Sequence, residues 1–414
     1  MTTSKKKTNI IYAWIMWLIA AIFYAMDYFQ HTAPSVLIGP IAESMRIPVT
    51  TVGNIMSVYF PVYAVTQIPA GYLLDKFNIR YVLSCACLVV SLGLFFSTYP
   101  NEVALLIGRI FIALGSAFAF LGAIKTASLW IPEKDFPFAV GLTNTVGVLG
   151  GLLGQPILNE MILQYHWQEA VRIIIFSGLL IALLLFLTLQ QPAYYTVKKT
   201  KGLAFKYVVK IKSLWLMALY AGIMVGAIVN ALTELYGVIF LQQTNAISSE
   251  TASIINSMTF IGIAIGGPLH GFISSTFNNK RQWMLYSNIA TTALFASLAL
   301  VPLVDIPTGA LIALYFLIGF FVSSMLLSFG VIRSHFPKEN HASIFAFVNM
   351  IIAFCGAAFQ LIFGNMIAYL TPYLPSVGHH IIYSVCIIVL IIPLIISGYF
   401  CQRIKKAKFL LPAH

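Results

Sequence analysis

The chain contains twelve long apolar runs, and no other feature of the sequence restricts its fold as strongly. A helix needs about 20 apolar residues to cross the hydrocarbon core of a bilayer. Charged residues make up only 9% of the 414 residues, whereas a soluble protein carries about 25%. We therefore predict an all-α integral membrane protein whose surface mostly faces the lipid bilayer. Polar or proline-containing breaks delimit the predicted spans: 11–38, 50–74, 80–98, 102–130, 137–162, 170–190, 212–241, 250–275, 282–301, 308–333, 342–370 and 379–402.

The longest polar stretch lies between the sixth and seventh predicted spans. It covers residues 191–211 and is rich in lysine. This predicts an N-terminal six-helix bundle at 1–190, a cytoplasmic linker at 191–211 and a C-terminal six-helix bundle at 212–414.

The distribution of positive charge predicts the orientation of the chain. With twelve spans both termini lie on one side, and twenty of the 24 Lys and Arg residues fall on that side. Positive charge is retained in the cytoplasm, so we expect both termini to be cytoplasmic in a bacterial inner (plasma) membrane. The net charge of +12 then reflects membrane topology, and we expect no nucleic acid partner.

An internal duplication relates the two halves of the chain. At an offset of 205, Pro132, Asn144, Gly151, Gln155, Ile157, Met161 and Ile162 match Pro337, Asn349, Gly356, Gln360, Ile362, Met366 and Ile367. An offset of 200 aligns Ser57, Phe60, Gly71, Phe77 and Asn78 with Ser257, Phe260, Gly271, Phe277 and Asn278. Such parallel repeats predict two pseudo-symmetric bundles with a solute site near the midplane and alternating access to it.

Residues 71–80, which read GYLLDKFNIR, resemble the signature loop G-x-L-x-D-R-x-G-R-R of the major facilitator superfamily. Arg109 and Gly115 match that superfamily's R-x-x-x-x-x-G pattern in the fourth span. The resemblance extends over the whole chain, because the span count, the linker and the duplication agree with it. It implies a transporter of small solutes.

The resemblance also implies a role for the loop. Gly71, Asp75 and Arg80 would form a cytoplasmic latch, in which the carboxylate interacts with a neighbouring helix end; the alternative is that these are ordinary solvated loop charges. Asn78 replaces the usual glycine, which we attribute to the ability of Asn to visit the left-handed region. The second copy has Ser275 in place of Asp75, so only the N-terminal loop is expected to gate.

Four charged residues lie deep within predicted spans, namely Asp27, Arg109, Lys125 and Glu234. An intramembrane charge is costly and is a functional-site candidate by default. At 1.5 Å per residue, Asp27 lies ~16 Å and Arg109 ~10 Å below the outer ends of their spans, so a pair between them is geometrically reasonable. Protonation of Asp27 would release Arg109, which predicts a proton-coupling pair; a purely structural ion pair is the alternative.

Lys125 lies ~8 Å from the cytoplasmic end of the fourth span. It either snorkels to the interface or binds a carboxylate or phosphate of the solute, with help from Asn144. Glu234 is a candidate for proton coupling, but binding of an amine, binding of a cation or pairing with a nearby cation are all open.

Polar side chains that can line a solute site occur on several spans. His31 follows Asp27 by four residues and shares its helical face; it could relay a proton, contact an anion or simply be hydrogen-bonded. Tyr59, Tyr63 and Gln67 form one stripe, which serves either ligand binding or helix packing. Asn230, Asn256 and Asn349 are further candidates in the second half.

Four glycines in the fifth span are predicted to have a structural role instead. Gly147, Gly150, Gly151 and Gly154 form a small-residue face, which allows another helix to approach closely.

We therefore expect a secondary active transporter that moves a small anionic or zwitterionic solute by proton symport and works as a monomer. The alternative is a proton-coupled antiporter that exports a drug or metabolite. An enzyme is disfavoured because no H-E-x-x-H motif or histidine cluster lies in a span, and nucleotide-driven transport because no phosphate-binding loop occurs. We expect no cofactor and no metal, since no Cys/His cluster has ligand spacing.

Overall fold

The computed structural model describes residues 10–47, 49–192, 208–245, 247–276, 279–304, 306–370 and 378–406. All regular secondary structure in these ranges is helical. The chain divides into two compact units: unit 1 contains Met1–Ala139, Val146–Leu203 and Phe336–Ala346, and unit 2 contains Val140–Thr145, Ala204–His335 and Phe347–His414. Most of the predicted linker, residues 193–207, lies outside the described residues, and the predicted domain limits stay predictions.

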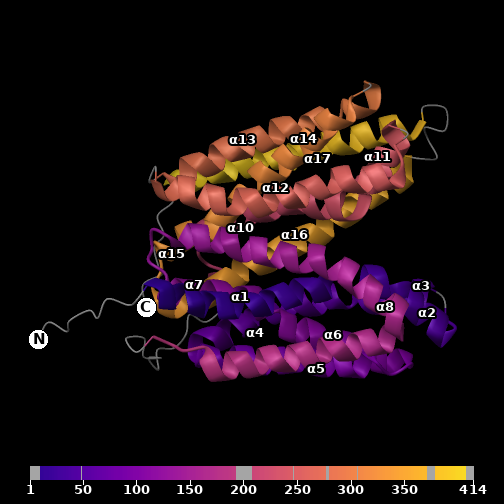
Figure 1. The fold of residues 1–414 in the computed structure, drawn as a ribbon. Helices are drawn as coiled ribbons and strands as arrows, with labels where there is room; N and C mark the ends of the chain where they lie inside the picture. The colour runs from indigo at the N-terminus through magenta and orange to yellow at the C-terminus, as the bar shows by residue number, and fades with distance from the viewer. Residues whose placement is uncertain are drawn as a thin grey trace, which may run out of the picture. The chain divides into compact units, whose positions relative to one another are not determined.

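The first half of the chain forms eight helices in sequence order (Figure 1). They are α1 (Ile10–Thr32), α2 (Pro34–Met45), α3 (Val49–Ser57), α4 (Tyr59–Lys76), α5 (Ile79–Ser97), α6 (Glu102–Ser116), α7 (Ala119–Trp130) and α8 (Phe136–Thr188).

The second half contains α-helices interrupted by short π- and 3₁₀-helical segments. They are α10 (Lys212–Val225), η1 (Gly226–Tyr236), α11 (Gly237–Asn245), α12 (Ser249–Thr276), α13 (Lys280–Leu298), η2 (Val301–Leu303), α14 (Thr308–Val322), η3 (Ser323–Leu326), α15 (Leu327–Arg333), η4 (Lys338–Asn340), α16 (His341–Leu370) and α17 (Gly378–Lys406).

Eleven helical stretches of the described chain are long and apolar enough to cross a membrane. The second predicted span, 50–74, is helical as α3 and α4 but is not among these eleven. Its polar stripe of Tyr59, Tyr63 and Gln67 lowers its hydropathy. The break at Val58 shortens the helix further, because Pro61 lacks the N–H that would bond to the carbonyl of Ser57. Together with this interrupted helix, the eleven stretches correspond to the twelve predicted spans.

Several spans are broken in mid-course, and two of the breaks match in the repeat. The fourth span changes from α6 to α7 at Ala117 and Phe118. The tenth span passes from α14 through η3 to α15. At the offset of 205 these positions coincide, so the two units share an interrupted helix at equivalent places.

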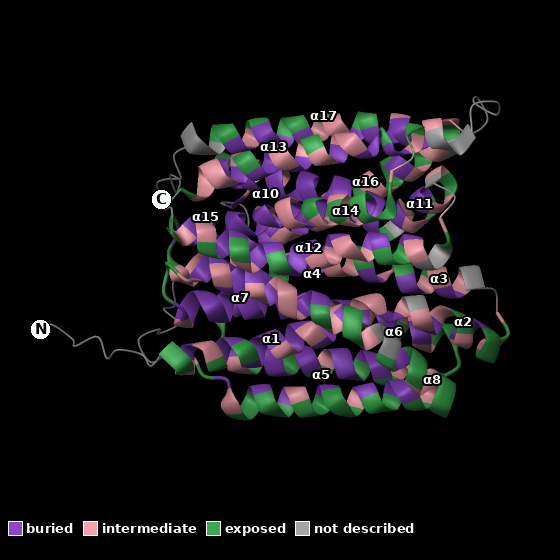
Figure 2. Ribbon diagram, turned by 45° about the horizontal axis from the view of Figure 1, so that its top comes forward, coloured by how far each residue is buried: buried purple, intermediate pink, exposed green. Residues whose placement is uncertain are grey.

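Helix packing in unit 1 depends on close contacts between small residues. α5 runs along α6, and α1 along α7. The predicted glycine face is confirmed, because an added Cβ on any of its four glycines would collide with α1: Gly147 meets Tyr24, Gly150 meets Ala25, Gly151 meets Tyr28 and Gly154 meets Phe29. Figure 2 shows the consequence for burial, since α7 is almost entirely buried whereas the end of α8 is mostly exposed.

The fifth and sixth predicted spans meet at one residue instead of across a loop. α8 turns back near its middle (Figure 1), and the turn lies at His166, which has φ 67° and ψ 154°. Residues 163–169, which separate the two predicted spans, are therefore part of α8. This backbone region is almost exclusive to glycine, and a side chain there costs about 1–3 kcal/mol.

We expect His166→Gly to raise the thermal unfolding temperature of the purified protein in detergent. Relief of the backbone strain outweighs the larger conformational entropy of glycine in the unfolded chain, for a net gain of about 1 kcal/mol. His166→Ala is the control, because alanine retains the Cβ and therefore the strain. An equal change in both variants would contradict a backbone origin.

Candidate functional site

A buried arginine organises the polar interior of unit 1. Arg109 on α6 is 5% exposed. Its Nε donates to the carbonyl of Met56 over 3.0 Å, and one terminal nitrogen donates to the carbonyl of Gln30 over 3.4 Å. The guanidinium carbon also lies 4.5 Å from the ring centre of Tyr59. Because the break between α3 and α4 interrupts the helical ladder near Met56, that carbonyl is available to the guanidinium.

Asp27 on α1 lies beside this arginine. It is 4% exposed, and its carboxyl group faces Arg109 and Ser116 closely enough to interact with both. Within the described part of the chain, however, its Oδ1 has no hydrogen-bond partner, and no direct ion pair joins it to Arg109. The two residues are therefore neighbours across α1 and α6, with the guanidinium held mainly by carbonyls; the predicted coupling role remains a prediction.

The predicted aromatic stripe of α4 extends this cluster. The rings of Tyr59 and Tyr63 stack with centres 5.5 Å apart, and the ring of His31 lies 5.5 Å from that of Tyr59. Gln67 is fully buried, and neither its amide nitrogen nor its amide oxygen has a partner among the described residues. An unpaired buried amide is costly, so Gln67 is well suited to receive a ligand or a water.

A second polar cluster occurs in unit 2, on the π-helical segment η1. Asn230 donates to the Glu234 carboxylate over 2.7 Å, and Glu234 is exposed. Asn256 on α12 donates to the carbonyl of Thr233 over 2.8 Å, and Gln360 on α16 donates to that of Asn230 over 3.2 Å. π-helical turns are frequent at functional sites, and here they expose carbonyls that side chains of neighbouring helices bind.

The remaining asparagine candidates have less defined surroundings. Asn144 and Asn349 are both half-buried, and Asn144 Nδ2 has no partner in the described part of the chain. Gln360 was not predicted as a site residue. Its match with Gln155 in the internal repeat was the signal that could have identified it.

Lys125 forms a buried ion pair that the sequence did not predict. It is 1% exposed, and its Nζ lies 2.6 Å from Asp75 Oδ1 and 2.5 Å from the carbonyl of Lys338. Asp75 also accepts hydrogen bonds from the backbone of Ala342 (3.1 Å) and Ser343 (2.8 Å) and from the Ser343 hydroxyl (2.7 Å). The carboxylate thus lies at the N-terminus of α16, within unit 1. A substrate-binding role for Lys125 would require this ion pair to open.

The rest of the signature loop is fitted to the same helix start. An added Cβ on Gly71 would lie 2.5 Å from the Cβ of Ala346, so only glycine allows this approach. Arg80 stacks on Phe186, with its guanidinium carbon 4.8 Å from the ring centre.

The reason that we gave for Asn78 is wrong. Its φ is −65°, and its side chain accepts a hydrogen bond from the Arg80 backbone, which caps α5. Helix capping therefore explains the departure from the glycine of the signature, and left-handed geometry is not required.

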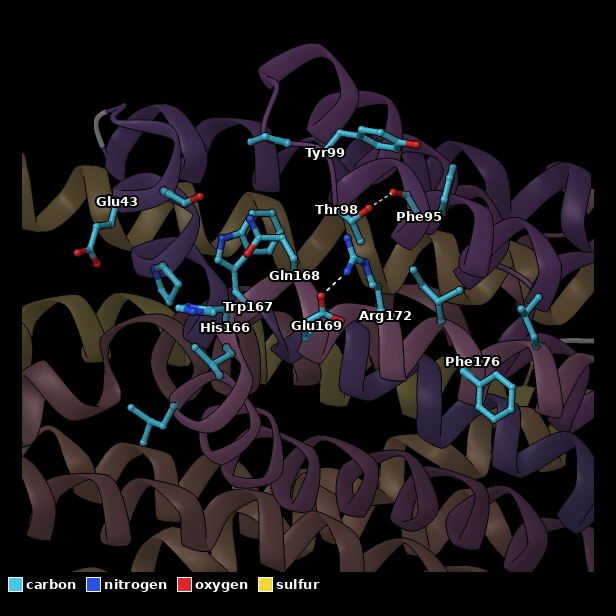
Figure 3. Close-up of a pocket in the computed structure, with 17 residues that line it drawn as sticks. Glu43, Phe95, Thr98, Tyr99, His166, Trp167, Gln168, Glu169, Arg172 and Phe176 are labelled. Carbon is cyan, nitrogen blue, oxygen red and sulfur yellow. Dashed lines mark hydrogen bonds and ion pairs between the residues drawn. The ribbon is translucent and has the colours of Figure 1, made fainter.

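Unit 1 also contains a pocket that the sequence did not predict, with a volume of about 1210 Å³. Residues of α2, α5 and α8 line it, and Figure 3 shows Glu43, Tyr99, His166 and Trp167 around it. Arg172 forms an ion pair with Glu169 at its edge. The pocket is amphipathic, because Phe176 and other exposed apolar residues lie beside these polar groups.

The chain is similar to known transporters. It is 26% identical to the uncharacterized transporter YybO of Bacillus subtilis over 180 residues, which are 42% of this chain and 41% of that protein. It is 24% identical to the hexuronate transporter of Bacillus subtilis over 349 residues, 79% of this chain and 81% of that protein.

Among solved structures, the fold is similar to that of the transporter FucP in its outward conformation. The TM-score is 0.69 at 17% identity, over 93% of this chain and 99% of that chain. This similarity confirms the predicted all-α membrane fold of two six-helix bundles.

The sequence profile of the Major Facilitator Superfamily matches residues 16–359 and 235–413. The chain is therefore a multi-pass integral membrane protein and a transporter, not an enzyme, and it belongs to the Major Facilitator Superfamily.

Proposed function

We propose that this protein is a proton symporter for a small organic anion of the sugar-acid class. The observation that carries the proposal is the buried Asp27 beside Arg109, with a carboxylate oxygen that has no partner among the described residues. The similarity to a hexuronate transporter over 79% of the chain supports the class of solute. Import by alternating access is part of the proposal.

Electrostatic balance explains how protonation is linked to anion binding. While Asp27 is ionised, its negative charge offsets the positive charge of Arg109 in a site of low dielectric. Protonation of Asp27 leaves the guanidinium unbalanced, and the carboxylate of a solute restores neutrality. Arginine suits this role because its fork of N–H donors matches a carboxylate.

The hydroxyl groups of a sugar acid need both donors and acceptors. In unit 1, His31, Tyr59, Tyr63 and Gln67 supply them near Arg109. In unit 2, Asn230 and Glu234 form a hydrogen-bonded pair that can bind neighbouring hydroxyls, and Asn144, Asn256 and Asn349 are further candidates. Glu234 stays a candidate for a second proton site.

The gating role of the signature loop belongs to the same proposal. Asp75 binds the first turn of α16 and the ammonium of Lys125 at the same time. A change in either contact therefore alters the hydrogen bonding of the first turn of α16. From the charge distribution we also propose that both termini are cytoplasmic in a bacterial inner membrane, and that the protein works as a monomer.

Transport tests the function directly. In proteoliposomes, an outside-acid pH gradient should drive accumulation of a radiolabelled hexuronate such as glucuronate. Efflux driven by the same gradient would instead indicate the antiport alternative.

Asp27→Asn should abolish this accumulation, because the amide cannot exchange a proton. Counterflow exchange of labelled for unlabelled solute should persist, since it needs no net proton movement. Asp135→Asn is the matched control, because Asp135 lies at the start of α8 outside the cluster, and it should behave as wild type. Unchanged accumulation in Asp27→Asn would reject the coupling role.

Lys125→Met should destabilise the protein by about 3 kcal/mol, because it leaves the buried Asp75 carboxylate without its cation. Adding Asp75→Asn should recover part of this loss. The free energies of unfolding of the wild type, the two single variants and the double variant give the coupling energy between Lys125 and Asp75.

The exposed pair of Glu169 and Arg172, whose side chains are 52% and 60% exposed, is the control for this cycle. Its coupling energy should stay below about 1 kcal/mol. A Lys125–Asp75 coupling energy no larger than that of the exposed pair would contradict the assigned ion pair.

A further inference from the structure

The pocket of about 1210 Å³ lies at the end of unit 1 that is opposite to the signature loop. α5 begins in that loop at Ile79 and ends at Ser97, and the pocket is lined from this far end of α5, from the last turns of α2 and from the turn of α8 at His166. Because α5 is a membrane span, its end places the pocket at the level of the lipid headgroups. Tyr99 and Trp167 also line the pocket, and such aromatic residues are enriched at this level.

The polar side of the pocket carries three exposed charged side chains. Arg172 and Glu169 form an ion pair on α8, and Glu43 on α2 has no ion-pair partner among the described residues. An exposed ion pair is worth less than about 1 kcal/mol, so a ligand can replace either partner at little cost. Two carboxylates and one guanidinium give this side a net negative charge, which disfavours a ligand whose only charge is negative.

The apolar side of the pocket continues into a stripe along the second half of α8. Phe176 lines the pocket, and Leu180, Leu183 and Leu187 follow at intervals of four, three and four residues, which keeps them on one face of the helix. Each of the four is more than half exposed. From Phe176 to Leu187 the helix rises ~16 Å, about half of the ~30 Å hydrocarbon core. The stripe therefore matches the acyl region of one leaflet.

The three kinds of group follow one another in a defined order. In the view of Figure 3, Arg172 lies between Glu43 and Phe176. Phe176 follows Arg172 by four residues, so both lie on one face of α8. A carboxylate, a guanidinium and an apolar stripe in this order are complementary to an ammonium, a phosphate and acyl chains.

We propose that this pocket binds a phospholipid whose zwitterionic headgroup carries a primary ammonium, as in phosphatidylethanolamine. The Arg172 guanidinium binds the phosphate, which its fork of N–H donors matches, and the acyl chains lie along the stripe of α8. Glu43 accepts hydrogen bonds from the ammonium, a contact that a quaternary ammonium cannot make because it has no N–H. The site takes no part in proton coupling. In the proposed orientation of the chain the lipid belongs to the outer leaflet.

Native mass spectrometry of the delipidated protein tests the headgroup. The probes are dioleoyl lipids with an ethanolamine, a choline or a glycerol headgroup. The ethanolamine lipid should bind about fivefold more tightly than either of the others, as expected for one exposed charged contact. Equal binding of the three lipids would overturn the assignment.

Two variants change the net charge of the pocket in opposite directions. Glu43→Gln removes a negative charge and Arg172→Gln removes a positive one, and both side chains are exposed, so both variants should fold. A zwitterion needs both charges, and each variant should lower the affinity for the ethanolamine lipid about fivefold. An affinity that rises in one variant and falls in the other would show attraction by net charge alone and would overturn the site.

Glu160→Gln is the matched control for Glu43→Gln. Glu160 is an exposed carboxylate on α8 that accepts a hydrogen bond from Gln164, and it is outside the pocket lining. This variant should bind the ethanolamine lipid like wild type, and an equal loss in both Glu→Gln variants would contradict a local site.

The apolar stripe has a separate test. A dihexanoyl lipid with the same ethanolamine headgroup keeps the charges but lacks most of the chain, and each buried CH₂ contributes about 0.8 kcal/mol. It should bind at least tenfold more weakly than the dioleoyl lipid. Equal binding of the two would exclude the stripe of α8 from the site.

Discussion

The guanidinium of Arg109 must be neutralised and hydrogen-bonded inside an apolar bundle, and the interior of unit 1 is arranged around this requirement. A buried charge of this kind is tolerated only when polar partners replace the water that it has lost. Carbonyls of Met56 and Gln30 and the face of Tyr59 supply them. Because these partners come from separate helices, one side chain fixes the relative positions of α1, the α3–α4 break and α6. Asp27 is buried beside the guanidinium, and among the described residues no direct ion pair joins the two side chains.

Interrupted helices provide polar partners elsewhere in the molecule as well. The N-terminus of α16 presents backbone N–H groups to the Asp75 carboxylate, where the partial positive charge of a helix start favours an anion. In unit 2, the π-helical segment η1 presents carbonyls that Asn256 and Gln360 bind. Helix ends and irregular backbone thus satisfy buried polar side chains in both units, which is tolerated where protein surrounds that backbone.

Local patterns in the sequence were sufficient to predict what depends on neighbouring residues. The apolar runs predicted the helices, and the four glycines of α8 predicted a close contact with another helix, which the structure identifies as α1. The contact between Asp75 and Ser343 joins residues 268 positions apart, so it could not be read from spacing. The same holds for the Lys125 ion pair and for the pocket that surrounds His166. Asn78 was misread because capping depends on local backbone geometry that composition does not specify.

The low hydropathy of the α3–α4 segment has a consequence for biogenesis. Tyr59, Tyr63 and Gln67 make the segment useful in the folded protein but poorly suited to partition alone into lipid. During synthesis, its polar stripe meets its main protein partner only once α6 is also inserted, because α4 packs along α6 and Arg109 lies against Tyr59. The residues that we assign to solute recognition thus also make integration of the second span depend on that of the fourth.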